Sequence, residues 1–267
     1  MDLHLSGRSA VVTGASKGIG LAVVGALLDE GAHVVAVSRG TSPELEKLAR
    51  PELVHLRADL MDPDAPARAV ARAVEAFGRL DVLVNNAGGP PPGISLPRTS
   101  FLDAADADWP AMFEFNLFTA VRAVRAALPH LLARGGSVVN VSTGLARQPA
   151  VGNAEYGAAK AALNSLTKVL SEEYAPQGVR FNTVSPGAVR TAWWTEEGGA
   201  ADIIAAMAGA DRDTVMDTLA PQMMNVSTGR LITPEEIADV VALLASPRSG
   251  STTGADFVVD GGYVKAL

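Results

Sequence analysis

Short apolar runs alternate with longer segments of helical periodicity along most of the chain. Each run is about five residues long, rich in β-branched residues and bounded by Gly, Pro or Asp, which is typical of a buried strand. We expect seven such strands, at 9–14, 32–38, 52–56, 81–85, 137–142, 179–185 and 255–260. We expect helices between them at 18–30, 43–49, 63–77, 107–133, 155–175 and 234–245. This alternation predicts an α/β fold of the Rossmann type, a doubly wound parallel sheet with helices on both faces.

The alternation breaks down at one place, between residues 191 and 230. This segment is rich in Met, Ala, Gly and Thr, and it carries Trp193 and Trp194 near its start. Long connections inside a compact domain are usually functional or disordered. We interpret the segment as a lid over a binding site, with a disordered loop as the alternative. Since no linker or repeat divides the sequence, residues 1–267 are expected to form a single domain.

Composition and charge exclude several classes of protein. A net charge of −7 argues against nucleic-acid binding, which usually requires a basic face. The chain has no cysteine, so disulfides, thiolate metal sites and cysteine nucleophiles are excluded. The four histidines are scattered without a second ligand at metal-binding spacing, and no metal site is expected. No signal-peptide pattern and no apolar run of about 18 residues is evident, which predicts a cytoplasmic protein without membrane contact.

The first expected strand runs directly into the glycine-rich turn TGASKGIG at 13–20, which opens the first helix. Gly14, Gly18 and Gly20 allow a sharp turn and the close approach of a ligand to the backbone. The helix that follows offers unpaired N–H groups and a positive dipole end to a pyrophosphate. The turn therefore predicts a dinucleotide site, to which Ser16, Lys17 and Ile19 also belong.

The end of the second expected strand bears on the choice of cofactor. An acidic residue here usually accepts the ribose 2′-hydroxyl of NAD, whereas an arginine suits the 2′-phosphate of NADP. This chain has Ser38 and Arg39 and no neighbouring carboxylate, and Lys17 adds a second positive charge. Because Arg39 can hold a phosphate with paired donors, we expect NADP(H) as the cofactor. The alternative is that both cations are solvated surface charges.

Tyr156 and Lys160 are four residues apart on one expected helix and hence on the same face. A free tyrosine has a pKa of about 10, too high for ready proton exchange near neutral pH. A neighbouring ammonium and the charge of an oxidised nicotinamide favour the phenolate and lower this pKa. The pair is therefore a candidate for general acid–base catalysis, although an exposed surface pair would show the same spacing.

Seven ordered motifs together resemble the short-chain dehydrogenase/reductase family, in its ketoacyl-reductase-like branch. They are the glycine-rich turn, AD-L at 58–60, NNAG at 85–88, Asn116 in EFNLF, YGAAK at 156–160, SPGAVRT at 185–191 and TGADFVVDGG at 253–262. The resemblance covers essentially the whole chain and implies strand order 3-2-1-4-5-6-7. It also implies further cofactor contacts at Asp59, Leu60, Asn86, Ala87, Gly88, Tyr156, Lys160, Pro186, Gly187 and Thr191.

The resemblance further implies how the site works. Tyr156 is the proton donor, Lys160 lowers its pKa and binds the nicotinamide ribose, and Asn116 holds a water in a proton relay. The family's catalytic hydroxyl lies thirteen residues before its tyrosine, which here is Thr143 and not the neighbouring Ser142. Adjacent residues of a strand point to opposite faces, so the two hydroxyls are not equivalent. We favour Thr143; Ser142 turned into the site is the alternative.

We expect an NADPH-dependent ketoreductase that acts on a medium-sized, mostly apolar ketone, and a homotetramer or homodimer. An NAD(P)+-dependent alcohol dehydrogenase and a non-catalytic NADP(H) sensor are the alternatives. Five residues of the lid suggest an apolar, adaptable wall of the substrate pocket: Trp193, Trp194, Met207, Met223 and Met224. The alternative, equally weighted, is that these side chains pack the lid onto the core. Arg147 and Arg190 are only thin support for an acidic carrier protein as substrate donor.

Overall fold

The computed structural model describes residues 1–98 and 100–265 and contains one seven-stranded parallel sheet. The strands are β1 (Ser9–Thr13), β2 (His33–Ser38), β3 (Leu53–Arg57), β4 (Val82–Asn85), β5 (Gly136–Val141), β6 (Val179–Pro186) and β7 (Asp256–Val259). Their order, β3-β2-β1-β4-β5-β6-β7, confirms the predicted fold class and topology. Each strand lies within one or two residues of its predicted range.

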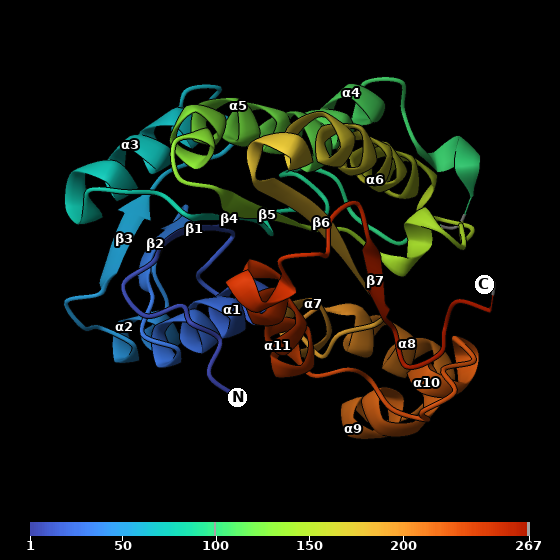
Figure 1. Cartoon of the computed structure of the whole chain (residues 1–267). Coiled ribbons are helices and arrows are strands. Elements are labelled where there is room, and N and C mark those ends of the chain that lie inside the picture. Colours follow the sequence, from blue (N-terminus) through green and yellow to red (C-terminus); the bar gives the residue numbers. More distant parts are fainter. Residues whose placement is uncertain (99, 266–267) are drawn as a thin grey trace.

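Helices cover both faces of the sheet (Figure 1). One layer contains α3 (Ala65–Phe77), α4 (Asp108–Phe113), α5 (Thr119–Leu132) and α6 (Ala154–Tyr174), and the other contains α1 (Gly18–Asp29), α2 (Pro43–Lys47) and α11 (Pro234–Ala245). Alternate residues of each strand supply the two cores. Val12 packs with Val24 and Ile237 on one face, whereas Val11 packs with Leu83 on the other. Burial on both faces explains the continuous apolar runs of the strands.

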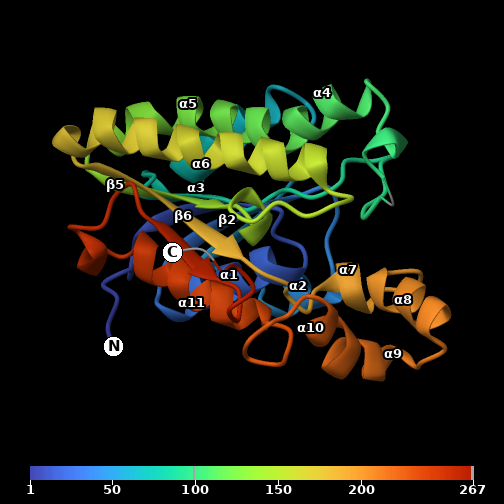
Figure 2. The same cartoon turned by 90° about the vertical axis from the view of Figure 1, so that its right-hand side faces the viewer.

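The sheet reverses its order of connection between β1 and β4. β1 and β4 are neighbours in the sheet. On its other side β1 pairs with β2, and on its other side β4 pairs with β5. Ligands of such sheets bind beyond the carboxyl ends of the strands at this point. The loops after β4 and β5 and the segment after β6 all extend from the same end of the molecule (Figure 2).

The helix predicted at 107–133 is divided into three parts. A π-helical turn, Glu114–Phe118, separates α4 from α5, and Asn116 lies buried within it. Such turns often occur at functional sites because they change the direction of a side chain without ending the helix. The apolar periodicity was continuous across this turn, which is why the sequence predicted a single helix.

Residues 191–230 form a small helical unit and not a disordered loop. It contains α7 (Ala192–Thr195), α8 (Ala200–Ala208), α9 (Arg212–Thr214) and α10 (Ala220–Met223). Trp194, Val215 and Leu231 belong to an apolar cluster of its own. Its two ends are joined by parallel pairing of Val189 with Ile232. The unit projects beyond the carboxyl ends of the strands (Figure 2).

Candidate active site

The glycine-rich turn is packed so closely that side chains would not fit at its glycines. A Cβ atom on Gly20 would lie 2.2 Å from the carbonyl oxygen of Gly14, and one on Gly14 would lie 2.9 Å from Cα of Ala87. A Cβ on Gly18 would lie 3.1 Å from the Thr191 side chain, and φ is positive at both Gly14 and Gly18. The turn thus brings the segment after β1 against those after β4 and β6.

Thr13 and Asn86 hold this junction together. Backbone N–H groups of Asn86 and Ala87 both donate to Oγ1 of Thr13, each at 3.0 Å. The Asn86 side chain donates in return to the carbonyl oxygens of Thr13 and Gly14, at 2.9 and 3.2 Å. The sequence analysis did not single out Thr13. Its position as the last residue of a strand, directly before the glycines, is the signal that could have identified it.

The first turn of α1 is open to an anion. Its N-cap residue, Lys17, provides no side-chain hydrogen bond to the helix, although Ser42 caps α2 in this way. Uncapped N–H groups at a helix start are donors for a phosphate. Ile19 faces the core, and the carbonyl oxygen of Ser16 accepts a hydrogen bond from Ser42. These residues fit the pyrophosphate of a dinucleotide.

The ends of β2 and β3 carry the groups expected at the adenosine end of the cofactor. Ser38 is buried, donates to the carbonyl of Gly40 and lies 2.9 Å from Nε2 of His55. Arg39 is exposed, and its carbonyl oxygen accepts a hydrogen bond from Nε of Arg57 at 2.9 Å. Arg57, which no sequence motif indicated, adds a third cation to Arg39 and Lys17.

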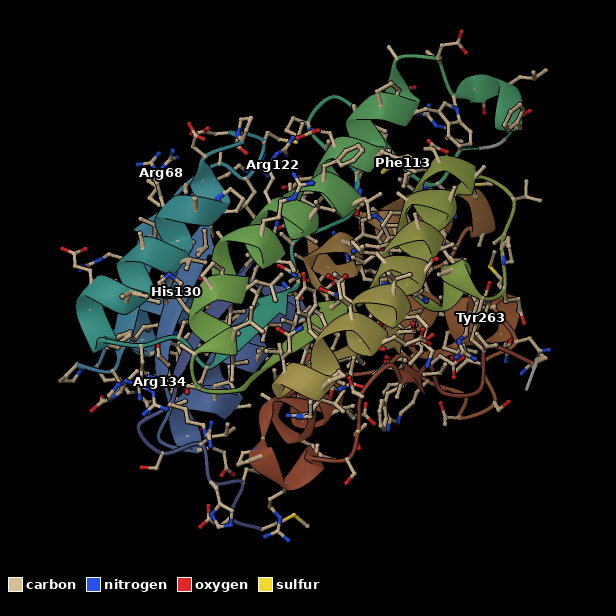
Figure 3. All side chains as sticks on the ribbon, turned by 45° about the horizontal axis from the view of Figure 1, so that its top comes forward. Arg68, Phe113, Arg122, His130, Arg134 and Tyr263 are labelled. Carbon is tan, nitrogen blue, oxygen red and sulfur yellow. The ribbon has the colours of Figure 1, made fainter. Side chains whose placement is uncertain are left out.

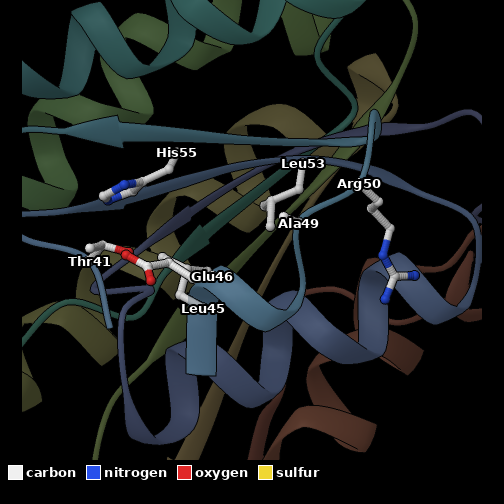
Figure 4. Close-up of a pocket in the computed structure, with 7 residues that line it drawn as sticks. All are labelled: Thr41, Leu45, Glu46, Ala49, Arg50, Leu53 and His55. Atoms are coloured by element: carbon white, nitrogen blue, oxygen red, sulfur yellow. The ribbon is translucent and has the colours of Figure 1, made fainter. Parts of the chain in front are cut away.

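A hollow of about 360 Å³ lies between α2 and β3 (Figure 4). The imidazole of His55 and the side chains of Thr41 and Glu46 lie at one end of it, and Arg50 lies at the other. Burial lowers the pKa of His55, and the charge of Arg57 lowers it further. His55 is therefore neutral at pH 7, and the local positive charge comes from the arginines.

Two predicted contacts follow β3. Asp59 is exposed, and its carboxylate accepts a hydrogen bond from the backbone N–H of Met61 at 3.0 Å. This bond fixes the turn into α3. Leu60 is buried in the core on the α3 side of the sheet. The Asp59 carboxylate is therefore accessible to a ligand, whereas the Leu60 side chain is not.

Lys17 forms an ion pair with the helical unit at 191–230. Its ammonium lies 2.7 Å from the carboxylate of Glu196, and both side chains are largely exposed. This ion pair joins the glycine-rich turn to the segment just after α7. Because the pair is solvent-exposed, it contributes little stability and can exchange for another anion.

Tyr156, Thr143 and Lys160 meet where β5 ends and α6 begins. Thr143 lies near enough to Tyr156 for its hydroxyl to favour the phenolate, and it also accepts a hydrogen bond from the backbone N–H of Leu145 at 3.3 Å. Lys160 is only 2% exposed, and its Nζ donates to the carbonyl oxygen of Val141 at 2.8 Å. The ammonium of Lys160 thus lies against the end of β5, on the helix that also carries Tyr156.

The neighbouring hydroxyl is turned inward. Ser142 is buried, and its Oγ lies 3.4 Å from the backbone carbonyl oxygen of Lys160. Thr143, by contrast, caps the short helical turn Gly144–Ala146 that follows β5, so the two hydroxyls have different partners. Of the two hydroxyls, that of Thr143 affects the pKa of Tyr156, and Thr143 stays the predicted catalytic hydroxyl.

Asn116 and Gly88 lie beside Lys160. The side chain of Asn116 exchanges two hydrogen bonds with the backbone of Gly89, each 2.9 Å long. A Cβ atom on Gly88 would lie 2.7 Å from Nζ of Lys160 and 2.9 Å from Oδ1 of Asn116. The absence of a side chain at Gly88 therefore leaves room for the ammonium.

The end of β6 provides the remaining predicted contacts. Pro186 is the last residue of β6, and Gly187 packs so closely on Asp260 that a Cβ atom would lie 2.8 Å from its Cα. Thr191 is the N-cap of α7 and faces Gly18 across the turn. These residues connect the glycine-rich turn with the base of the lid.

Burial shifts both titratable groups of the site toward their neutral forms. It raises the pKa of Tyr156 to about 12, and the hydrogen bond from Thr143 offsets only part of this effect. Burial also lowers the pKa of Lys160 to about 8. The sequence predicted a lowered pKa for Tyr156; in the protein by itself, loss of hydration dominates and raises it. Tyr156 therefore keeps its proton at neutral pH.

The lid residues divide into two groups. Trp194 is buried and Met224 packs on the same apolar cluster, so both stabilise the lid. Trp193, Met207 and Met223 remain exposed. The two arginines considered for an acidic partner are already paired: Arg147 with Asp256 at 2.7 Å and Arg190 with Asp217 at 2.6 Å.

Neither a metal cluster nor a membrane helix occurs in the described part of the chain. Among residues 1–98 and 100–265, no three His, Asp or Glu side chains gather as ligands. His130 lies on α5 in the layer that also carries Arg68 (Figure 3). No helix over the same residues is long and apolar enough to cross a membrane.

Comparison with known proteins agrees with this geometry. A family model described as enoyl-(acyl carrier protein) reductase matches residues 14–264. The short-chain reductase protein NovJ of Streptomyces niveus is 38% identical, over 95% of this chain and 92% of NovJ. L-xylulose reductase of Bos taurus is 35% identical over 99% of both chains. The structure of L-sorbose reductase from Gluconobacter frateurii, complexed with NADPH and L-sorbose, matches with a TM-score of 0.88 and 31% identity over 100% of both chains.

The fold and the site together define an oxidoreductase that acts on alcohol or ketone groups with a nicotinamide cofactor. The chain belongs to the short-chain dehydrogenase/reductase family. This confirms the family and the enzyme class that the sequence motifs predicted.

Proposed function

We propose that the protein is an NADPH-dependent ketoreductase, with Tyr156 as general acid. The observation that carries the proposal is the junction of Thr143, Tyr156 and Lys160 beside the glycine-rich turn. NADPH, when bound, supplies the hydride that the carbonyl carbon receives. Tyr156 gives its proton to the carbonyl oxygen, and the hydroxyl of Thr143 donates a hydrogen bond where negative charge develops.

The pKa values of the site suit the direction of reduction. A phenol with a pKa of about 12 is fully protonated at neutral pH and can act as an acid. Lys160, with a pKa of about 8, is mainly charged at pH 7 and stabilises the phenolate that remains after proton transfer. Asn116, fixed by Gly89, is proposed to hold the water that returns a proton to Lys160.

We propose Arg39, Lys17 and Arg57 as the residues that select NADPH over NADH. Arg39 is exposed, and Arg57 is held against its backbone by the bond to its carbonyl oxygen. Arg39 and Arg57 at the ends of β2 and β3, together with Lys17 on the glycine-rich turn, favour a 2′-phosphate. Ser38 is proposed to shape this turn through its bond to Gly40.

For the substrate, we propose a medium-sized, mostly apolar ketone under a lid formed by residues 191–230. Exposed Trp193, Met207 and Met223 offer apolar surface on this segment. L-xylulose reductase and L-sorbose reductase are named for ketoses, which supports a ketone as the reacting group but favours a more polar substrate. A panel of apolar ketones and ketoses, followed by NADPH absorbance, separates the two.

A second candidate is an NAD+-dependent alcohol dehydrogenase, which one observation favours. The carboxylate of Glu196 already neutralises Lys17, and a carboxylate near the 2′ position disfavours a phosphate there. The two candidates are distinguished by binding of 2′,5′-ADP and 5′-ADP to the protein alone, measured by calorimetry. Clearly tighter binding of 2′,5′-ADP would support NADPH as the cofactor. Equal affinities for the two nucleotides would reject NADPH as the preferred cofactor.

The role of Tyr156 is tested by Tyr156→Phe. We expect turnover to fall by at least about 10³-fold, since the acid is lost, while NADPH binding changes little. Full activity in this variant would remove Tyr156 from the mechanism. The expected homotetramer, or homodimer, is tested by light scattering of the purified protein, and the cytoplasmic location stays a prediction.

A further inference from the structure

Arg98 connects three segments at the start of α6. Its Nε donates to the carboxylate of Glu155, one of its Nη atoms to that of Asp108, and the other to the backbone carbonyl of Asp103, each at 2.7 Å. Its backbone N–H donates to the carbonyl of Gly152 at 2.8 Å. One side chain thus joins the loop after β4, the start of α4 and the first turn of α6.

The two side chains at the centre of this network are largely buried. Glu155 is 1% exposed and Arg98 only 13%. Contact with the two carboxylates raises the pKa of Arg98 despite its burial. A buried carboxylate is strongly unfavourable unless it is paired and hydrogen-bonded, so Glu155 depends on Arg98. A small hollow beside the pair, lined by Phe101 and Val151, leaves the network close to the surface without exposing it.

The packing of the backbone leaves little freedom at this junction. A Cβ atom on Gly152 would lie 2.1 Å from the carbonyl oxygen of Arg98, and Gly152 has a φ of +87°. Phe101 packs edge-on against Trp109 of α4, with ring centroids 6.2 Å apart. Loop, α4 and α6 are therefore held as one unit immediately before Tyr156.

We propose that Arg98 is a positioning residue for proton transfer by Tyr156, acting through Glu155. This rests on the proposed function of Tyr156. The carboxylate that Arg98 holds belongs to the residue directly before Tyr156, so a shift of the first turn of α6 moves the phenol as well. A fixed guanidinium with donors in three directions restrains that turn far better than a single contact. Misplacement of a reacting group by about 1 Å can cost about 10²-fold in rate.

The test compares Arg98→Met with a matched variant, Arg79→Met. Arg79 also binds a carboxylate that is 1% exposed, Asp81, at 2.6 Å, but at the start of β4 and therefore at the other end of the strands. We expect kcat to fall about 10- to 100-fold in Arg98→Met and less than about 3-fold in Arg79→Met. NADPH affinity should stay unchanged in both. Equal losses in both variants, or normal kcat in Arg98→Met, would overturn the proposal.

A second readout does not depend on turnover. Tyrosine labelled with ¹³C reports the ionisation of Tyr156 by NMR, with Tyr156→Phe to assign its signal. If Arg98 holds the phenol in its partly buried position, the pKa of Tyr156 should fall from about 12 toward 10 in Arg98→Met and stay unchanged in Arg79→Met. An unchanged signal in Arg98→Met would refute positioning, even if no ketone substrate is found. Activity of Tyr156→Phe would instead refute the proposed general acid.

A double variant covers the case in which Arg98→Met does not fold. Arg98→Met combined with Glu155→Met removes both buried charges, and such apolar replacements usually fold. We expect this protein to be folded and still to show the lowered kcat and the lowered pKa of Tyr156. Wild-type values of both quantities in the double variant would show that the ion pair only stabilises the fold.

Discussion

Lys160 should make the protein less stable than a neutral side chain of the same length would. Its ammonium is 2% exposed, and burial lowers its pKa from 10.5 to about 8. At 1.36 kcal/mol per pKa unit, this difference corresponds to about 3 kcal/mol of unfavourable free energy when the group is charged. The hydrogen bond from Nζ to the carbonyl of Val141 is lost on substitution, which costs about 1–2 kcal/mol. Lys160→Met should therefore raise the free energy of unfolding by about 1–2 kcal/mol at pH 7 while abolishing turnover.

The pH dependence of the free energy of unfolding shows independently whether Lys160 destabilises the protein. Below about pH 8, Lys160 is charged in the folded state and the full cost is present. Between pH 8 and 10.5, the folded protein has released this proton while the unfolded chain still binds it. Stability of the wild type therefore rises with pH in this range relative to Lys160→Met, and the advantage of the variant shrinks.

Urea unfolding followed by tryptophan fluorescence, at about pH 7 and about pH 9.5, measures both effects. Lys168→Met is the matched control, because Lys168 lies on the same helix and its side chain is 61% exposed. We expect this control to change stability by less than about 0.5 kcal/mol at either pH. A Lys160→Met protein that is less stable than the wild type, with no dependence on pH, would refute the reasoning.

Four further substitutions probe the rest of the site. Thr143→Val should lower kcat about 10²-fold because the hydroxyl donor is lost, whereas Ser142→Ala should change it less than about 3-fold; steady-state kinetics that rank them in the opposite order would contradict the assignment. Gly88→Ala places a methyl group 2.7 Å from the ammonium of Lys160 and should lower kcat with the fold retained by circular dichroism; unchanged kinetics would show that the ammonium can move. Glu196→Gln frees the lysine of the glycine-rich turn and should tighten binding of 2′,5′-ADP several-fold in calorimetry, about 1 kcal/mol at most for an exposed pair; weaker binding would show that Glu196 does not compete with the phosphate.

The sequence by itself determined the elements, the topology and the family. Apolar runs such as SAVVT and HVVAVS are buried on both sides, and this local pattern specifies parallel strands without reference to the rest of the chain. The ordered motifs also identified Tyr156, Lys160 and Thr143 as candidates, because the spacing of these residues along the chain is visible in the sequence. The π-helical turn at 114–118 was not predicted, since its apolar periodicity is that of a regular helix.

Only the tertiary structure decided which groups meet. Arg57 reaches Arg39 because β3 pairs with β2, and Arg98 reaches Glu155 because the loop after β4 packs against the first turn of α6. Both contacts link distant positions, and no local pattern encodes them. The raised pKa of Tyr156 is also a tertiary property, because it depends on how much water the folded chain removes from the phenol. Residue types and their spacing identify the candidate reacting groups, whereas tertiary packing determines the pKa values and the contact partners of these groups.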